Sequence, residues 1–481
     1  MMFLLLFFVL VVLVWVVCKG TSNKGPPSFP GWLPVIGHLH LMARYDQTNI
    51  FEFYKILSEE SIKIGGMMTF YLGPNAVILI SDPDEAQIVS RHCLEKHYAY
   101  NIAKPWLGDG ILTADVATWK SHRKLMNLAF TQQVLNGIIS VFNSQSRRLT
   151  RHFDQNEHTF EPLTMLLMNN LETICITSLA IDPKKHKEIF SEYVAAIKNM
   201  FGVMLERFLK YWLHFDFIYN FSSLKTRQDM VVKVLHNLSH TVMQKRKTEL
   251  ACKELPTTSD SFRPLMDAIL ELSMDKGLLT DRQVREEIDT IIFGGHDTTA
   301  TSLTYTLMIL GSDLIRQEKV YKEIIEVLGP LDRDVEKEDL VNLVYMENVI
   351  KESLRLYPIA PVFPRVSHGE LKIRNYTFPA RTTFLIDAWS LHRHSVWGPD
   401  ADEFRPERWE DLETIPKAYS AFGVGRRSCI GRTYAMMSMK ITLVHLLRRY
   451  KVTSDISKLT LKLDSLLRPA SGHNISIELR K

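Results

Sequence analysis

One stretch near the end of the chain, residues 422–431, constrains the fold more than any other. Its sequence is FGVGRRSCIG, and a helix-forming run over residues 433–448 follows it. The stretch places a single thiol, Cys429, in a glycine-rich loop at the start of a helix. Backbone N–H groups and the positive end of the helix dipole favour the thiolate form there. The loop therefore predicts an activated cysteine.

The number of thiols limits what such a site binds. One thiolate cannot hold a structural zinc ion or an iron–sulfur cluster by itself, because these need three or four protein ligands. One thiolate is sufficient for haem, since the macrocycle supplies four further ligands. The alternative is a buried free cysteine in a tight turn, which is the usual state of a lone cysteine. The loop alone leaves both interpretations open.

Composition excludes some classes of function. The 481 residues are 46% hydrophobic and 23% charged, which is typical of a globular protein with a large core. The formal net charge of +4 argues against dedicated nucleic-acid binding, although it allows a local basic face for an acidic protein partner. The five cysteines are widely spaced and odd in number, which fits a reducing compartment without a disulfide framework.

The N-terminus begins with an uninterrupted apolar run over residues 1–17, followed by Cys18, Lys19 and Lys24. This length is at the short end for a transmembrane helix. A cleavable signal peptide is the alternative, but the run has no positive n-region and no small-residue cleavage site. Positive charges after the run place the rest of the chain on the cytoplasmic side. We therefore expect an uncleaved membrane anchor over residues 1–18.

The remaining chain divides into a hinge and a body. Four prolines among residues 26–34 predict a stiff spacer, so we expect a hinge over residues 19–36 and a catalytic domain over residues 37–481. Residues 67–80 are β-rich about a turn, and helical patterns dominate from about residue 82 to 348. Further β-rich runs are expected within 359–386 and 459–479. These patterns predict a mainly α protein with small β-sheets.

A long helix is expected to begin near Thr280 and to run towards residue 317. Its middle contains two adjacent glycines (294–295), followed by Asp297 and Thr298. Each glycine costs a helix roughly 1 kcal/mol relative to alanine, and such local disagreement tends to mark a functional site. The glycines would let a flat ligand approach, while Asp297 and Thr298 would supply protons to it. The alternative is a packing glycine pair with a helix-bonded threonine.

Three shorter motifs are weak when taken singly. WKSHR places Trp119 and Arg123 on one helix face, and ESLR does the same for Glu352 and Arg355. PERW, which contains Arg408, precedes the cysteine loop. An exposed ion pair such as Glu352–Arg355 would contribute under about 1 kcal/mol. Each motif alone fits an ordinary surface.

Together, and in this order along nearly the whole chain, these motifs resemble the cytochrome P-450 superfamily of haem-thiolate monooxygenases. FGVGRRSCIG fits the haem loop F-x-x-G-x-R-x-C-x-G at every fixed position. GGHDTT fits the oxygen-activating helix, ESLR the E-x-x-R helix, PERW the P-E-R loop and WKSHR the W-x-x-x-R helix. The resemblance is strongest to the microsomal clan that contains fatty-acid ω-hydroxylases and many insect members. It implies the P-450 fold, with haem between a long distal helix and the proximal cysteine loop.

The resemblance implies roles for individual residues. Cys429 matches the axial ligand of haem b, which is otherwise held non-covalently. Asp297 and Thr298 match the acid–alcohol pair that protonates the distal oxygen. Four residues match positions that bind the two haem propionates: Trp119, Arg123, Arg365 and Arg427. Three more match fixed positions of the haem loop: Phe422, Gly425 and Gly431. A buried structural triad is matched by Glu352, Arg355 and Arg408.

One position departs from the pattern of this clan. The clan often has a glutamate that forms an ester with a haem methyl group, and Gly294 stands in its place here. A covalent haem link is therefore not expected. The restraint that directs oxidation to terminal carbons is also missing, so strict ω-hydroxylation does not follow from the resemblance.

The resemblance also implies partners. The chain has no reductase-like segment, so electrons from NADPH are expected to arrive through a separate flavoprotein reductase, with cytochrome b5 as a second candidate donor. A basic proximal surface for this partner is expected from Lys120, Lys124, Arg426, Arg427 and Arg432, for which a merely solvated face is the alternative. The expected location is the endoplasmic reticulum membrane, with the catalytic domain facing the cytoplasm.

The leading functional hypothesis is a membrane-bound monooxygenase that inserts one atom of O₂ into a lipophilic substrate. A fatty acid, a hydrocarbon, a terpenoid or a xenobiotic would all fit the apolar lining expected from residues 106–111, 201–205, 293–295, 360–363 and 466–467. One alternative is a haem-thiolate isomerase or dehydratase, a class that usually lacks the acid–alcohol pair. The other is a non-catalytic carrier of a hydrophobic ligand.

Overall fold

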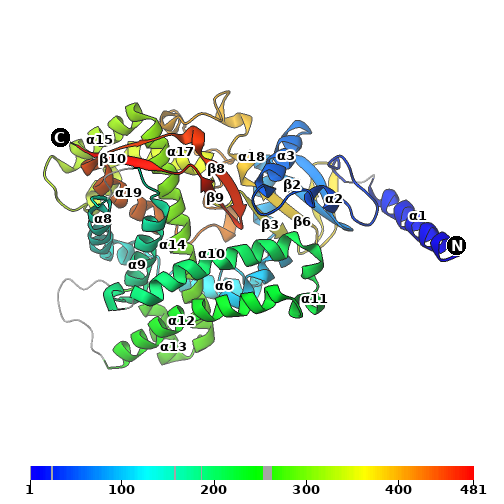
Figure 1. The fold of residues 1–481 in the computed structure, drawn as a ribbon, viewed down its shortest axis with the longest axis horizontal. Coiled ribbons are helices and arrows are strands. Elements are labelled where there is room, and N and C mark those ends of the chain that lie inside the picture. Colours follow the sequence, from blue (N-terminus) through cyan, green and yellow to red (C-terminus); the bar gives the residue numbers. More distant parts are fainter. Residues whose placement is uncertain (1, 23–24, 156–158, 186, 253–262, 481) are drawn as a thin grey trace.

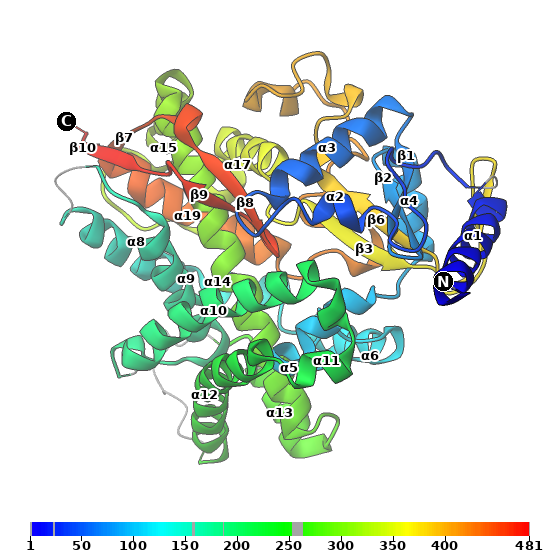
Figure 2. The ribbon, with the colours of Figure 1, turned by 45° about the vertical axis from the view of Figure 1, so that its right-hand side comes forward.

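The architecture was obtained as a computed structural model, which describes residues 2–480 except 23–24, 156–158, 186 and 253–262. A body of helices lies to one side of a small four-stranded sheet (Figure 1, Figure 2). The longer helices are α1 (Met2–Ser22), α3 (Ile50–Lys63), α4 (Pro83–His92), α6 (Val116–Met126), α8 (Ile139–Phe153), α9 (Leu163–Leu179), α10 (Lys187–Leu209), α12 (Ser223–Ala251), α13 (Asp267–Lys276), α14 (Asp281–Ser312), α15 (Leu314–Leu328), α17 (Val344–Leu356) and α19 (Arg432–Arg449).

Short helical segments connect these elements. The short α-helices are α2 (Leu39–Met42), α5 (Lys104–Leu107), α7 (Gln132–Gly137), α11 (Asp216–Asn220), α16 (Lys337–Asn342) and α18 (Ala388–Leu391). The 3₁₀ turns are η1 (Tyr98–Ile102), η2 (Pro183–Lys185), η3 (Tyr211–His214), η4 (Ser395–Trp397), η5 (Pro406–Trp409), η6 (Gly425–Arg427) and η7 (Ile456–Lys458).

The strands form one four-stranded sheet and three two-stranded ribbons. The sheet has the order β1 (Met67–Leu72), β2 (Asn75–Ile80), β6 (Thr383–Asp387), β3 (Val362–Val366). Only β2 and β6 pair in parallel within it. The antiparallel ribbons are β4 (Leu371–Ile373) with β5 (Tyr376–Phe378), β7 (Tyr450–Ser454) with β10 (Ile475–Leu479), and β8 (Thr460–Asp464) with β9 (Leu466–Ser471). The prediction of a mainly α fold with small sheets is confirmed.

Helix α14 runs through the helical body and organises the core. Its start is fixed by a capping box, in which the Thr280 hydroxyl accepts from the Gln283 amide and the Gln283 side chain accepts from the Thr280 amide. Its end differs from the prediction, because Asp313 leaves the helical conformation and its side chain caps α15 by accepting from the Arg316 amide at 3.0 Å. Two helices therefore occupy the segment predicted as one.

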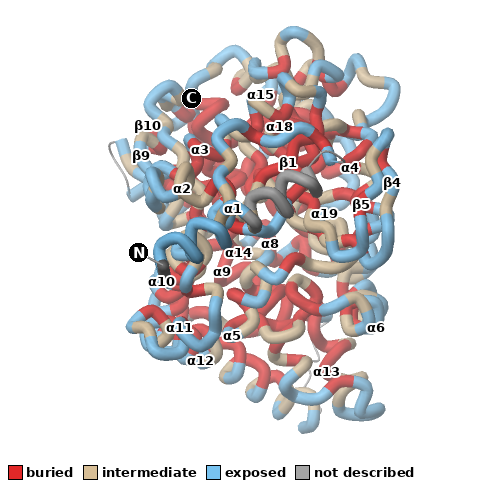
Figure 3. Tube along the Cα trace, turned by 90° about the vertical axis from the view of Figure 1, so that its right-hand side faces the viewer, coloured by how far each residue is buried: buried red, intermediate tan, exposed pale blue. Residues whose placement is uncertain are grey.

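Helix α14 is buried over most of its length, with an opening in its middle. Residues 299–311 are all buried, and they pack into the main hydrophobic cluster with α9, α17 and α19. By contrast, Gly294 is exposed, although it lies in the middle of the same helix. Figure 3 shows this concentration of buried residues inside the molecule. The opening around Gly294 thus marks the place where α14 borders an internal space.

The N-terminal helix α1 projects away from the rest of the chain (Figure 1). Several of its apolar side chains are exposed, among them Phe3, Phe7 and Phe8. Within the part of the chain that is described, no helix combines the length and the hydropathy needed to cross a membrane. Part of the predicted hinge packs on the sheet, since Thr69 donates to the Pro27 carbonyl and accepts from the Phe29 amide through backbone atoms.

Candidate active site

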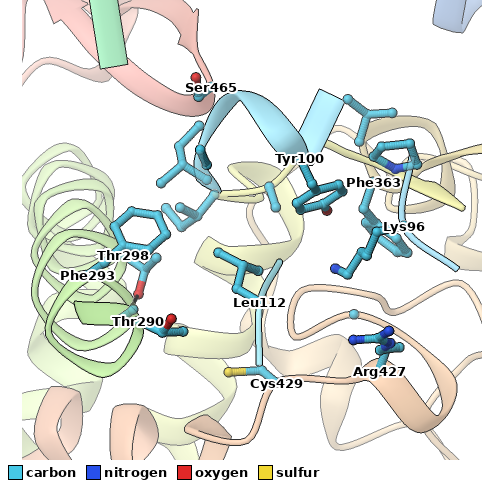
Figure 4. Close-up of a pocket in the computed structure, with 18 of the residues that line it drawn as sticks. Lys96, Tyr100, Leu112, Thr290, Phe293, Thr298, Phe363, Arg427, Cys429 and Ser465 are labelled. Atoms are coloured by element: carbon cyan, nitrogen blue, oxygen red, sulfur yellow. Dashed lines mark hydrogen bonds between the residues drawn. The ribbon is translucent and has the colours of Figure 1, made fainter. Parts of the chain in front are cut away.

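The space beside α14 is a cavity of about 600 Å³. It lies between α14, the loop that contains Cys429, strand β3, helix α10 and the tip of the β8–β9 ribbon (Figure 4). All five segments predicted to line an apolar pocket contribute to it, through Trp106, Leu107, Ile111, Phe201, Met204, Leu205, Phe293, Gly294, Gly295, Ala360, Val362, Phe363 and Leu466. Not every residue of the predicted ranges faces the cavity: Gly108, Asp109, Gly110, Gly202, Val203, Pro361 and Leu467 are absent from its described lining.

The cysteine loop is shaped by backbone bonds and by one glycine conformation. The Cys429 amide donates to the Phe422 carbonyl at 2.8 Å, which closes the loop at its base. Gly425 has a φ of +71°, and a Cβ there would lie 2.8 Å from the Ser90 carbonyl oxygen. Glycine is therefore required at this position both by conformation and by space. Gly431 lies next to the thiol, with α19 beginning at the following residue.

The environment of the Cys429 thiol differs from the sequence prediction. Its exposed surface faces the cavity, and protein encloses it otherwise. Burial raises the pKa of the Cys429 thiol, against the opposing effects of the Gly431 amide and of the Arg123 and Arg432 charges. Coordination to a metal would favour the thiolate against this effect of burial, because a metal-bound thiol is deprotonated outright.

Other protein ligands for a metal are missing at this cysteine. Among the residues with described side chains, no group of three or more His, Cys, Asp or Glu residues is arranged to hold a metal ion. A metal on Cys429 would therefore take its remaining ligands from a non-protein group. A porphyrin meets this requirement.

Cations gather at one side of the cavity, and the described residues of the cavity wall include no acid to balance them. Arg365 is buried, and the Arg427 guanidinium lies 4.2 Å from the Trp119 ring centre. Burial, and then the Arg365 charge, lower the pKa of Arg427 to about 10. The wall of the cavity contains no aspartate or glutamate among its described residues. Uncompensated buried cations are costly, so this arrangement fits an anionic group such as the two propionates of haem.

The hydrogen bonds of these arginines also fit a bound anionic group. Arg427 donates from Nε to the Leu94 carbonyl at 3.1 Å and from Nη2 to the Ala114 carbonyl at 3.2 Å. Its Nη1 is buried and has no partner within the described structure. Arg123 donates from Nη1 to the Ser428 carbonyl at 2.9 Å, which ties α6 to the cysteine loop. The predicted propionate residues Trp119, Arg123, Arg365 and Arg427 are thus brought together at one cavity.

Lys96 joins this group and was missed by the sequence analysis. It lines the cavity, and its ammonium lies 4.2 Å from the Tyr100 ring centre. Burial, followed by the Arg365 and Arg427 charges, lowers the pKa of Lys96 well below its usual value. A lone lysine in a loop carries no sequence signal of its own. Lys96 is identified only in the structure, where η1, β3 and the cysteine loop come together.

The adjacent glycines of α14 have different roles. A Cβ on Gly294 would meet nothing within 4 Å, because this residue faces the cavity. A Cβ on Gly295 would lie 2.7 Å from the Ile174 side chain, so this glycine allows α9 to pack closely. The Thr298 hydroxyl lines the cavity and donates to the Gly294 carbonyl at 2.7 Å. The motif thus combines a packing glycine and a helix-bonded threonine with an open space beside Gly294.

Asp297 lies behind this wall rather than in it. Its side chain is fully buried, and Oδ1 accepts a short hydrogen bond from Arg468 of strand β9, while Oδ2 has no partner among the described groups. Burial lowers the pKa of the neighbouring His296 to about 4, so that imidazole is neutral at physiological pH. Arg468 was not predicted, because it lies 171 positions after Asp297 in the sequence, and one sequence does not reveal such a distant pairing.

The predicted triad forms a buried ion network under the cavity. Glu352 accepts from Arg355 Nε at 2.9 Å and from Arg408 Nε at 2.8 Å. The Trp409 indole donates to the same carboxylate at 3.0 Å. Glu352 and Arg355 are both 0% exposed, so the surface ion pair suggested by ESLR alone is wrong. The network joins α17 to η5 and supports the segment that leads into the cysteine loop.

These features define a class of protein before any comparison. A mainly helical chain encloses a cavity with one cysteine at its floor, cations without acids at one side and a glycine-opened helix at the other. This combination defines a haem-thiolate protein.

Comparison with known proteins assigns the family. The family model "Cytochrome P450" matches residues 26–477, and the chain belongs to the cytochrome P450 family. "Cytochrome P450 4V2" of Pongo abelii is 30% identical over 482 residues, covering 96% of this chain and 91% of the relative. "Cytochrome P450 4c21" of Blattella germanica is 30% identical, covering 95% and 93%. "Cytochrome P450 4d2" of Drosophila melanogaster is 29% identical, covering 98% and 97%.

Membership confirms the predicted class of enzyme and its cofactor. The chain is a haem-thiolate monooxygenase that uses haem b with a cysteine thiolate as axial ligand. The family implies O₂, a lipophilic substrate and a redox partner that passes on electrons from NADPH. The resemblance to a clan with insect members is also confirmed by these relatives.

Proposed function

We propose that this chain is a membrane-attached monooxygenase that inserts one atom of O₂ into a lipophilic substrate held over Cys429. The observation that carries the proposal is the position of this single thiol, which faces an apolar cavity flanked by unbalanced cations. Electrons come from NADPH through a separate flavoprotein reductase, with cytochrome b5 as a second donor. The exposed basic residues Lys120, Lys124, Arg426 and Arg432 support docking of an acidic partner.

Haem would be held by residues from four parts of the chain. Cys429 binds the iron, and Phe422, Gly425 and Gly431 shape the loop around it. The propionates are bound by Trp119, Arg123, Arg365 and Arg427, to which the geometry adds Lys96. Bound haem supplies the iron that activates O₂ and transfers one oxygen atom to the substrate. The triad of Glu352, Arg355 and Arg408 supports the loop and takes no part in the chemistry.

Protons reach the site along α14. Thr298 donates its own proton to Gly294, which leaves its oxygen free to accept from water or another donor in the cavity. Asp297 stands one residue earlier and holds an unpartnered buried oxygen, while Arg468 keeps its other oxygen in place. We assign Thr298 as the group that positions the donor at the site, and Asp297 as the acid that renews the proton.

The first experiment tests the class of chemistry. The purified, haem-loaded protein should show the Soret shift of a thiolate-ligated haem when it is reduced in the presence of carbon monoxide. Its turnover should require NADPH, reductase and O₂. Turnover without O₂ would instead establish an isomerase or dehydratase, and a normal spectrum with no turnover of any bound ligand would establish a carrier.

Replacing Thr298 tests proton delivery. Thr298→Ala removes the cavity-facing oxygen, so product formation should fall by about a hundredfold. NADPH consumption should continue, with hydrogen peroxide released in place of product. Thr298→Ser keeps the hydroxyl and should retain most of the coupling between NADPH and product. Equal coupling in the alanine and serine variants would contradict the role of the hydroxyl.

Gly294 sets how closely a substrate approaches the backbone of α14. Gly294→Glu fills open space, and glutamate favours helix by roughly 1 kcal/mol over glycine, so the variant should fold normally. We expect its products to shift towards oxidation at chain ends, as determined by product analysis on a linear substrate. Gly294→Gln introduces a side chain of similar size without the charge, so it shows whether size or charge causes the shift in products. Gly295→Ala is the contrasting variant: its methyl group would meet Ile174, so it should reduce the stability of the protein. An unchanged product pattern in Gly294→Glu would contradict the role of Gly294 in specificity.

Membrane attachment rests on two apolar surfaces. The helix α1 exposes Phe3 by 86%, and Phe221 beside α11 is exposed by 82%. Trp212 and Phe217 lie near Phe221 in sequence and are also exposed. Aromatic and apolar side chains of this kind favour a lipid interface. We therefore propose an anchor at residues 1–18, a hinge at 19–36 and a catalytic domain at 37–481, located at the endoplasmic reticulum membrane and facing the cytoplasm.

A further inference from the structure

We propose that the substrate of this cavity is a neutral lipophile, a hydrocarbon or an alcohol, and not a carboxylate anion. The inference rests on the proposed function and narrows its substrate class. It follows from the charges, the hydrogen bonds and the rings of the cavity wall.

The charged side chains of the wall are confined to one side. Among the described lining residues they are Lys96, Arg123, Arg365 and Arg427. Lys96 and Arg427 lie on the side of the cavity that leads to the cysteine loop (Figure 4). Arg123 donates to the Ser428 carbonyl of that loop, and the Arg365 charge acts on both Lys96 and Arg427. The two haem propionates would need these cations. The opposite wall, formed by α14, α10 and the tip of the β8–β9 ribbon, contributes no charged residue to the described lining.

Charges just behind the opposite wall are already paired. Arg468 forms an ion pair with Asp297, and both side chains are buried, although Arg468 Nε has no partner among the described groups. Lys462 of the β8–β9 ribbon forms an ion pair with Asp464, with 3.3 Å between Nζ and Oδ2. A substrate carboxylate at this wall would find no free cation, and a buried anion without a partner is costly.

Hydroxyl groups on α14 suit a neutral ligand better than an anion. Four of them line the cavity, and three donate their protons to helix carbonyls: Thr290 to Glu286 at 2.9 Å, Thr298 to Gly294 at 2.7 Å and Ser302 to Thr298 at 2.8 Å. The fourth, Thr299, has a buried hydroxyl with no partner among the described groups. The O–H of an alcohol therefore finds acceptors here, whereas a carboxylate finds neutral donors at most and no charge to balance its own.

The rest of this wall is aromatic and apolar. The rings of Trp106 and Phe293 have centroids 5.2 Å apart, and those of Phe201 and Phe293 are 5.8 Å apart. Leu112 projects into the same space (Figure 4). These rings offer a hydrocarbon chain or ring extensive contact area. The Trp106 indole N–H is buried with no partner among the described groups, so it is a neutral donor for an alcohol or ester oxygen.

The test compares ligands that share one alkyl chain. Dodecan-1-ol, methyl dodecanoate and sodium dodecanoate are titrated into the haem-loaded, full-length protein at neutral pH. Binding is followed by the haem spin-state shift and, independently, by calorimetry. The alcohol and the ester should bind at least about tenfold more tightly than the carboxylate, a difference of about 1.4 kcal/mol.

A variant that supplies the missing charge completes the test. Ser465 is exposed at the rim of the cavity, at the tip of the β8–β9 ribbon (Figure 4). Ser465→Arg should improve dodecanoate binding about tenfold relative to dodecan-1-ol, while the matched Ser465→Gln should not. A wild-type protein that binds dodecanoate as tightly as the alcohol would overturn the inference, as would an unchanged preference in Ser465→Arg. These outcomes leave the proposed function standing, since that function is tested separately by the carbon monoxide spectrum.

Discussion

Cys429→Ser should abolish monooxygenase activity while leaving the polypeptide folded. A serine hydroxyl stays protonated at neutral pH and offers no anionic, polarisable ligand to iron. Burial already disfavours the charged form at this position, as the raised pKa of the Cys429 thiol shows, so the hydroxyl has still less tendency to ionise. Haem should be lost or bound weakly, and turnover should fall to background.

The readouts separate loss of function from loss of structure. Circular dichroism and thermal unfolding should resemble those of the haem-free wild-type protein. Cys252→Ser is the control, because Cys252 is an exposed free thiol at the end of α12, and it should retain full activity. Turnover in Cys429→Ser with a normal carbon monoxide spectrum would show that another group ligates the iron.

Glu352→Gln should have the largest effect on stability. The substitution leaves the Arg355 and Arg408 guanidinium groups buried without their shared carboxylate. Removing one member of a buried ion network costs about 3–5 kcal/mol, because the remaining charges lose their compensation. The free energy of unfolding, measured by chemical denaturation, should fall by this amount, and haem should be released earlier in the transition.

An exposed pair with the same spacing is the control. Glu52 and Lys55 are three residues apart on α3, with 2.7 Å between their charged atoms, and their side chains are 56% and 34% exposed. Glu52→Gln should change the free energy of unfolding by under about 1 kcal/mol. If both variants lose equal stability, the burial of the triad is not what stabilises this part of the fold.

The sequence was informative where a motif is contiguous. The haem loop, the glycine pair of α14 and the capping box at Thr280 are read from neighbouring residues, and the structure contains the predicted loop and helix start. Burial was not predictable in the same way. ESLR looks like a surface pair, and only the docking of η5 against α17 shows that Glu352 is enclosed.

Pairings between distant segments could not be read from one sequence. Lys96 gains its role from β3 and the cysteine loop, and Arg468 gains its role from α14. The opposing effect of burial on the Cys429 thiol was not predictable from the sequence for a related reason. The loop and the helix terminus are local and visible in the sequence, whereas the enclosing protein that raises the pKa of the thiol is not.

The parallel pairing of β2 with β6 has a consequence for how the chain is made. Val77 lies opposite Thr383, so strands about 300 residues apart must meet before the sheet is complete. At about 5–20 residues per second, a ribosome needs roughly 15–60 s to synthesise the intervening chain. During this time the β1–β2 hairpin presents an unpaired apolar edge, including Ile78 and Ile80, that invites wrong partners. Helices α4 to α17 are synthesised in this interval, so β6 becomes available to β2 only after most of the helical body has been made.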